Sequence, residues 1–218
     1  MERQKLVIAT PLYNSQGWGN YIRSLTQAVA VMERIRAAKG PKVFDYEFII
    51  PEGDSYVDSA RNRIAHAFLR GDGTHLMFWD SDVGADMPGF ARLLKAPVEV
   101  VGGAFPVKNA SNRWSVVLDH TPDGMLMRDT VTGLYRAVRV ATGFMKIART
   151  VFEKLQQAEP DNVYYDPFED TMLHGFFNFL MVGKYLLRED YGFCERCRRV
   201  KIPIWCETRI SFGHYGVK

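Results

Sequence analysis

The chain has few of the features that mark secreted or membrane proteins. It contains three cysteines in 218 residues, an odd number that argues against a disulfide framework and fits a reducing compartment. No segment approaches the ~18 consecutive apolar residues that a membrane span requires. The basic start at Met1–Lys5 leads into a strand-length apolar stretch, without the long apolar region of a signal peptide. We therefore expect a cytoplasmic protein without a transmembrane segment.

The sequence also has little excess of one sign of charge. The formal net charge of +3 is too small to indicate nucleic-acid binding, although it is compatible with an anionic ligand. The apolar fraction of 47% and the charged fraction of 24% are those of a soluble globular protein. The sequence shows no internal repeat, low-complexity tract or linker, and its length suits one well-buried core. These features predict a single domain over residues 1–218.

The first part of the sequence alternates between strand-like and helix-like segments. Strands are predicted at 6–9, 44–50 and 76–79, from short apolar runs that are bounded by turn formers. Apolar residues recur at helical spacing between Asn20 and Gly40 and again across Val57–Phe68. This order predicts parallel strands joined by right-handed crossovers.

The second part is less regular. It predicts strands at 98–101, 114–118, 136–140 and 204–212, and helices over 148–157 and 189–200. The whole pattern predicts an α/β fold, a Rossmann-like domain with a mixed, mostly parallel central sheet flanked by helices.

Two carboxylates one residue apart, Asp80 and Asp82, end the apolar run Leu76–Trp79. The exit of such a strand lies at the carboxyl end of a sheet, where open α/β folds bind ligands. Carboxylate oxygens suit Mn²⁺ or Mg²⁺, and such a cation can hold a diphosphate. A turn with a helix cap is the alternative explanation of this short pattern.

Basic side chains near this motif are candidates for anion binding. Arg61 lies in the first part of the second predicted helix, where the helix N-terminus favours anions. An exposed i,i+3 pair with Asp58 is the alternative. Lys108, Arg113 and Trp114 follow the flexible Gly102–Gly103 and are candidates for lining a cleft.

Two further candidates lie towards the end of the sequence. Asp190 follows Glu189 at the start of a predicted helix, where a carboxylate can act as a base or simply favour the helix dipole. His214 is flanked by Gly213 and Gly216, and a neutral imidazole can complete a Mn²⁺ shell that Asp82 begins. A surface histidine is the alternative.

The pair Cys194 and Cys197 forms a CxxC pattern, but it falls inside a predicted helix and has no second CxxC. Two thiols on one helical face that belongs partly to the core explain this pattern better than a metal or redox site.

Taken together, these residues resemble the GT-A-fold glycosyltransferases, chiefly those of the family 2 type. The resemblance runs in the family's order over nearly the whole chain. Residues 10–14 resemble the loop after the first strand, 58–62 the Ala-Arg-Asn stretch, and Asp80-Ser81-Asp82 the DxD motif. Residues 141–145 resemble the segment near the donor sugar, 189–194 the Glu-Asp-x-x-Phe-Cys element, and 214–216 the terminal His-x-Gly.

The resemblance implies a metal-dependent transfer of a sugar from a nucleoside-diphosphate sugar to an acceptor hydroxyl. It implies Mn²⁺ or Mg²⁺ held by Asp80, Asp82 and His214, and Asp190 as the base of an inverting reaction. It also implies a nucleotide-binding half at about 1–105, an acceptor-binding half at about 106–218 and a carbohydrate or glycoconjugate acceptor. The residues implied to bind the nucleotide are Thr10, Pro11, Tyr13, Asp58, Arg61, Asp80 and Ser81.

The donor base and the stereochemistry have alternatives. The acid that many family members place after the second strand is either Glu52 or Asp54. The Asp-Ser-Ala-Arg-Asn and Arg-Glu-Asp stretches are also similar to fungal Golgi mannosyltransferases, some of which retain configuration and use GDP-mannose. A UDP-sugar is therefore favoured as the donor, with GDP-mannose next.

Two other classes of protein are consistent with parts of the sequence. A sugar-1-phosphate nucleotidyltransferase needs a Gly-rich, Arg-containing loop after the first strand, and residues 10–19 contain neither Arg nor Lys. A non-catalytic nucleotide- or carbohydrate-binding module needs the same fold but no acids in its cleft. Both are less consistent with the sequence than the transferase.

Overall fold

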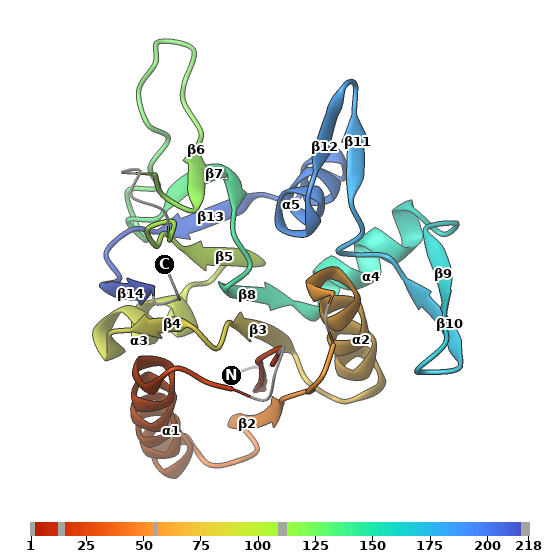
Figure 1. Ribbon diagram of the computed structural model, residues 1–218. Helices are drawn as coiled ribbons and strands as arrows, with labels where there is room; N and C mark the ends of the chain where they lie inside the picture. Colours follow the sequence, from red (N-terminus) through yellow and green to blue (C-terminus); the bar gives the residue numbers. More distant parts are fainter. Residues whose placement is uncertain (1–2, 13–15, 55, 109–112, 215–218) are drawn as a thin grey trace.

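The computed structural model describes residues 3–12, 16–54, 56–108 and 113–214, the side chain of His214 excepted. Its centre is an eight-stranded sheet with the order β2-β1-β3-β8-β5-β13-β7-β6 (Figure 1). The strands are β1 (Gln4–Ala9), β2 (Phe44–Ile49), β3 (His75–Trp79), β5 (Val100–Gly103), β6 (Val116–Leu118), β7 (Tyr135–Val140), β8 (Phe144–Ala148) and β13 (Ile204–Glu207).

The sheet is mixed. The pairs β1–β2, β1–β3 and β5–β13 are parallel, and the other neighbouring pairs are antiparallel. Because only β8 and β7 run against the rest, six of the eight strands share one direction. The expected α/β fold with a mixed, mostly parallel sheet is therefore confirmed.

Helices cover both faces of the sheet. On one face α1 (Gly19–Lys39) and α3 (Met87–Lys95) share a core with Leu6 and Ile8 of β1. On the other face α2 (Val57–Arg70), α4 (Arg149–Ala158) and α5 (Glu189–Arg199) share a core with Val7 and Ala9. Successive strand residues point to opposite faces, so a continuous apolar run serves both cores. Among the described residues no helix has the length and apolarity to cross a bilayer.

The order β2-β1-β3 creates a crevice beside β1. The chain passes from β1 through α1 to β2 on one side, and then through α2 to β3 on the other side of β1. Right-handed crossovers place these two helices on opposite faces. Ligands bind at the carboxyl ends of strands where the winding reverses in this way.

Short two-stranded pairs lie around the central sheet. β4 (Val83–Ala85) pairs with β14 (Phe212–His214) beside the end of β3. The hairpins β9 (Val163–Asp166)–β10 (Thr171–His174) and β11 (Leu180–Val182)–β12 (Tyr185–Leu187) belong to the second half of the chain (Figure 1).

The predicted single strand over 204–212 is wrong. It divides into β13 and β14, because the chain turns after Glu207, whose carboxylate accepts the Arg209 backbone N–H at 2.9 Å. Helix α3 was not predicted, although Asp86 caps it through the Gly89 N–H. Strand β8 and the two hairpins were not predicted either.

Candidate functional site

Asp80 lies where the buried strand β3 ends. Its backbone N–H donates to the Gly143 carbonyl at 2.9 Å, and its carbonyl accepts the Val83 N–H at 3.1 Å. These bonds hold the turn between β3 and β4 against the start of β8. A Cβ atom at Gly143 would lie 2.8 Å from Asp80 Oδ2, so a glycine is needed for the carboxylate to occupy this position.

Arg61 of α2 binds the Asp80 carboxylate from inside the protein. Its Nη2 donates to Asp80 Oδ1 at 3.1 Å and to Oδ2 at 3.0 Å. The Arg61 side chain is 3% exposed and that of Asp80 is 28% exposed, so the arginine is buried while the carboxylate still reaches solvent. The guanidinium also lies 5.1 Å from the ring centroid of Phe78. The exposed Asp58–Arg61 pair that we considered is therefore not what Arg61 forms.

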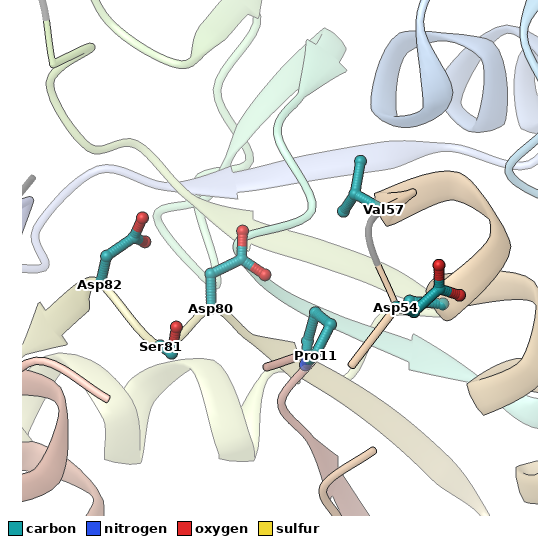
Figure 2. Close-up of a pocket in the computed structure, with 7 residues that line it drawn as sticks. Pro11, Asp54, Val57, Asp80, Ser81 and Asp82 are labelled. Atoms are coloured by element: carbon teal, nitrogen blue, oxygen red, sulfur yellow. The ribbon is translucent and has the colours of Figure 1, made fainter. Parts of the chain in front are cut away.

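A cavity of about 300 Å³ opens in front of Asp80. Figure 2 shows the Asp80 and Asp82 carboxylates on the same side of the β3–β4 turn, with Asp54 and Val57 on the far side of Asp80 from Asp82. The first turn of α2 contributes to the wall, so the positive end of this helix dipole faces the cavity. The lining residues are Pro11, Asp54, Val57, Ala60, Asp80, Ser81 and Asp82.

Asp82 is paired with a lysine from the chain beyond β5. The Lys108 ammonium donates to Asp82 Oδ2. Both side chains are partly exposed, Lys108 to 41% and Asp82 to 24%. Lys108, proposed from sequence only as a cleft-lining candidate, thus contacts the motif directly.

Asp54 is the acid after β2 that lines the cavity. Its Oδ2 accepts from Arg63 Nη1 at 3.0 Å, and Arg63 Nε donates to Asp166 at 2.8 Å. Glu52, the other candidate, is exposed and is not among the lining residues. Of the two candidate acids after β2, Asp54 is therefore the one that lines the cavity.

The remaining candidates for nucleotide binding occupy different positions. The buried Thr10 side chain is 2.7 Å from the Tyr21 hydroxyl and is not among the lining residues. Ser81 lines the cavity, and its carbonyl accepts the Trp18 N–H at 2.9 Å. Asp58 is half-buried and outside the lining set, and Tyr13 lies outside the described residues.

Glu189 and Asp190 begin α5, and both interact electrostatically with Arg61. Asp190 Oδ1 accepts the Tyr191 backbone N–H at 2.7 Å. Burial raises the pKa of both carboxyls. The positive charge of Arg61 lowers these pKa values, and the negative charge of Asp80 raises them. Burial lowers the pKa of Arg61, but the charges of Asp80, Glu189 and Asp190 raise it overall. One buried guanidinium is thus electrostatically coupled to three carboxylates.

His214 is placed by its backbone only. It is the last residue of β14 and pairs with Val83, the residue after Asp82. Its side chain lies outside the described part of the structure, so its predicted role as a metal ligand stays a prediction.

The chemistry of the cavity fits a divalent cation that a ligand helps to hold. In the described residues no group of three or more His, Cys, Asp or Glu side chains is arranged to hold a metal. Asp80 and Asp82 nevertheless present two carboxylates to one cavity. Mg²⁺ is commonly bound by one or two carboxylates together with substrate phosphates, and Mn²⁺ accepts the same oxygen ligands.

The CxxC thiols are part of the core. Cys194 and Cys197 are fully buried, and burial raises the pKa of the Cys194 thiol to about 12. A buried thiol with a raised pKa is a poor metal ligand and nucleophile. The interpretation of this pair as core residues is confirmed.

Sequence reasoning missed Val57 and Ala60 as wall residues, because their side chains carry no chemistry. It also missed the Arg63–Asp54 pair; the i,i+9 spacing across a strand-to-helix turn gives no local signal. The position of Asp54 just after β2 was the signal in the sequence that it lies near the site, since the carboxyl ends of parallel strands meet at one edge of the sheet.

No protein-family model and no curated protein matches this sequence. Among solved structures, A197 from STIV aligns with a TM-score of 0.59 at 17% identity, covering 98% of this chain and 87% of A197. GalNAc-T7, in a structure with UDP, GalNAc and Mn²⁺, aligns with a TM-score of 0.56 at 15% identity, covering 99% of this chain. The chain spans 44% of the length of that GalNAc-T7 structure. At these identities the similarity concerns the fold, and this chain has the GT-A fold.

Proposed function

We propose that this protein is a glycosyltransferase that moves a sugar from a nucleoside-diphosphate sugar to an acceptor hydroxyl. The observation that carries the proposal is the position of the Asp80 carboxylate. The buried Arg61 holds it at the carboxyl end of β3, where the winding of the sheet reverses, and Asp80 and Asp82 line the same cavity. A UDP-sugar is the favoured donor, since the similar GalNAc-T7 structure contains UDP, and GDP-mannose is next.

The proposed binding of the diphosphate follows from the electrostatics of the cavity. The first turn of α2 supplies the positive end of a helix dipole, which favours phosphate oxygens. Pro11 and Asp54 line the end of the cavity formed by the loops after β1 and β2, where the nucleoside would lie. Asp54 is fixed there by Arg63, so its carboxylate is ready to accept hydrogen bonds from a ribose or a base.

Asp80 and Asp82 would hold a divalent cation, Mn²⁺ or Mg²⁺, together with phosphate oxygens. When bound, that cation supplies Lewis-acid stabilisation of the negative charge on the departing nucleoside diphosphate. Arg61 fixes the orientation of the Asp80 carboxylate and balances its charge.

Asp190 is the proposed base. A base must accept the proton of the acceptor hydroxyl while the oxygen attacks the anomeric carbon. Burial raises the pKa of Asp190, which makes its carboxylate a stronger proton acceptor than an exposed aspartate. A base on the opposite side of the donor from the leaving group gives inversion of configuration. Glu189, whose pKa is also raised by burial, is the neighbouring candidate for this role.

Thermal stability with UDP, GDP, dTDP and CDP, each with and without Mn²⁺, tests the proposal. A ligand at ~100 times its dissociation constant adds ~2.7 kcal/mol, which raises the melting temperature of a domain of this size by about 5 °C or more. We expect such a shift with one nucleotide in the presence of Mn²⁺. Asp82→Asn should lose the shift, and Asp123→Asn, on an exposed turn, should keep it.

Three results would contradict the proposal. If the melting temperature of folded protein does not rise with any nucleotide, a non-catalytic module that does not bind these nucleotides would be favoured. A shift without turnover of the matching nucleotide-sugars would favour a binding module, and production of a nucleotide-sugar from a nucleoside triphosphate and a sugar 1-phosphate would favour a nucleotidyltransferase.

A further inference from the structure

The ion pair between Lys108 and Asp82 joins two parts of the chain beside the cavity. Asp82 follows β3 and Lys108 follows β5, and the ammonium donates to one of the two carboxylate oxygens of Asp82. Asp82 itself lines the cavity. The lysine therefore places a positive charge on one of the two carboxylates that we propose to receive a divalent cation.

The backbone next to Lys108 is fixed. The Val107 N–H donates to the Arg113 carbonyl at 2.9 Å, and the Ser115 N–H donates to the Phe105 carbonyl at 2.9 Å. The Phe105 N–H in turn donates to Ser115 Oγ at 3.0 Å. Since these bonds anchor the chain just before Lys108, the reach of its ammonium is set by its own four-carbon side chain.

The two cations beside the motif differ in how tightly they are held. Arg61 is buried and donates to both oxygens of Asp80, and a planar guanidinium in such a place is not exchanged readily. Lys108 is 41% exposed and is a compact charge on a flexible stem. An exposed pair of this kind contributes little free energy, so a divalent cation can displace the lysine.

We propose that Lys108 and the divalent cation exchange on Asp82. With a cation on the Asp82 carboxylate, the Lys108 ammonium is released by mutual repulsion and binds a phosphate oxygen of the donor beside Asp82. Lysine is a common phosphate ligand as a point charge, and the released ammonium has three donors to offer. The inference rests on the proposed function, because it assigns to Lys108 a place on the diphosphate of the same donor.

The exchange predicts effects of opposite sign in one variant. In Lys108→Met, Mn²⁺ without nucleotide should bind about two- to fivefold more tightly, because the cation no longer has to displace the Lys108 ammonium. The nucleoside diphosphate that binds best among UDP, GDP, dTDP and CDP should bind about tenfold more weakly in the presence of Mn²⁺, because a charge-assisted contact is lost. A lysine that only stabilises the fold would not separate the two affinities in this way.

Titration calorimetry and the electron paramagnetic resonance signal of free Mn²⁺ measure these affinities. Lys108→Arg keeps the charge and should stay within about threefold of the wild type in both. Lys184→Met removes an exposed lysine between β11 and β12 and should change neither. Melting temperatures show that each variant is folded.

Some results would overturn the exchange. The exchange is refuted by an unchanged or weakened Mn²⁺ affinity in Lys108→Met, whatever the nucleotide result. It is also refuted if neither the wild type nor Lys108→Met binds Mn²⁺. Unchanged affinity for the nucleotide removes Lys108 from the diphosphate. Wild-type protein that binds Mn²⁺ but none of the four nucleotides refutes the transferase function itself, which separates that failure from failure of the exchange.

Discussion

The two pairs of acids that we assign to the candidate site, one after β3 and one at the start of α5, have opposite surroundings. Asp80 and Asp82 follow β3, and each forms an ion pair with a cation, Arg61 in the first case and Lys108 in the second. Glu189 and Asp190 begin α5, and within the described residues neither forms an ion pair closer than 4.0 Å. The pKa of both is raised instead, mainly by burial.

This difference separates two kinds of chemistry. Carboxylates with cationic partners can exchange those partners for a metal ion or bring them to a phosphate. Carboxylates that are buried without such partners take up a proton more readily. Under the proposed function, the first region would hold the charges of a leaving diphosphate and the second would receive a proton from an acceptor.

The largest expected effect concerns Asp190. In Asp190→Asn the proposed base is lost, and transfer should fall about 10²- to 10⁴-fold, the usual contribution of general base catalysis. The affinity for the nucleoside diphosphate should stay nearly unchanged, because the other acid pair is intact. Steady-state transfer rates and nucleotide titrations measure the two quantities.

Glu189→Gln is the matched control for this variant, since it removes the adjacent carboxylate of the same helix turn. It should retain most of the turnover. Wild-type-like transfer by Asp190→Asn would remove Asp190 from the mechanism, and a loss in Glu189→Gln only would move the base by one residue.

Within the first pair, the two acids should differ in their effect on stability. Asp80→Asn leaves the Arg61 guanidinium buried without its counter-ion and should lower the free energy of unfolding by about 3 kcal/mol. Asp82→Asn removes a partly exposed partner of Lys108 and should cost about 1 kcal/mol or less. Urea unfolding monitored by circular dichroism gives both values. Equal losses in the two variants would show that Arg61 does not depend on Asp80.

The smallest expected effect is the dependence of stability on pH at the second pair. Burial raises the pKa of Glu189 above its usual value of 4.5, so the unfolded chain releases this proton at lower pH than the folded protein does. The contribution of Glu189 to stability is therefore full in acid and is lost as the pH rises through its folded pKa. Glu189→Gln, which cannot ionise, should gain stability relative to the wild type as the pH rises from about 4 to 7, by about 1 kcal/mol or less.

Unfolding of both proteins at several pH values measures this gain. The same comparison with Glu195→Gln is a control of opposite sign, because hydrogen bonds from Arg198 lower the pKa of Glu195. A relative loss of stability with rising pH in Glu189→Gln would show that this acid is stabilised by a partner, as Asp80 is.

The sequence predicts the first half of the fold better than the second. The strands β1, β2 and β3 and the helices α1 and α2 follow regular apolar patterns and short turns, so local signals agree with the sheet. In the second half, strand β8 is inserted between β3 and β5 although it comes after them in the chain. Such an insertion depends on pairing between distant segments, and no local pattern specifies it.

The candidate site shows the same limit. Pro11, Asp80, Ser81 and Asp82 are predicted because a strand end and a motif identify them, and all four line the cavity. The partner of each acid is less visible in sequence. Arg61 precedes Asp80 by 19 residues and Lys108 follows Asp82 by 26, and only the folded sheet brings them together.

A crystal structure with Mn²⁺ and the best-binding nucleoside diphosphate is the strictest test of the proposed site. We expect the diphosphate in the cavity of about 300 Å³, with the metal on Asp82 and the Arg61–Asp80 pair intact. A nucleotide bound elsewhere on the protein, or a metal that contacts neither Asp80 nor Asp82, would contradict it.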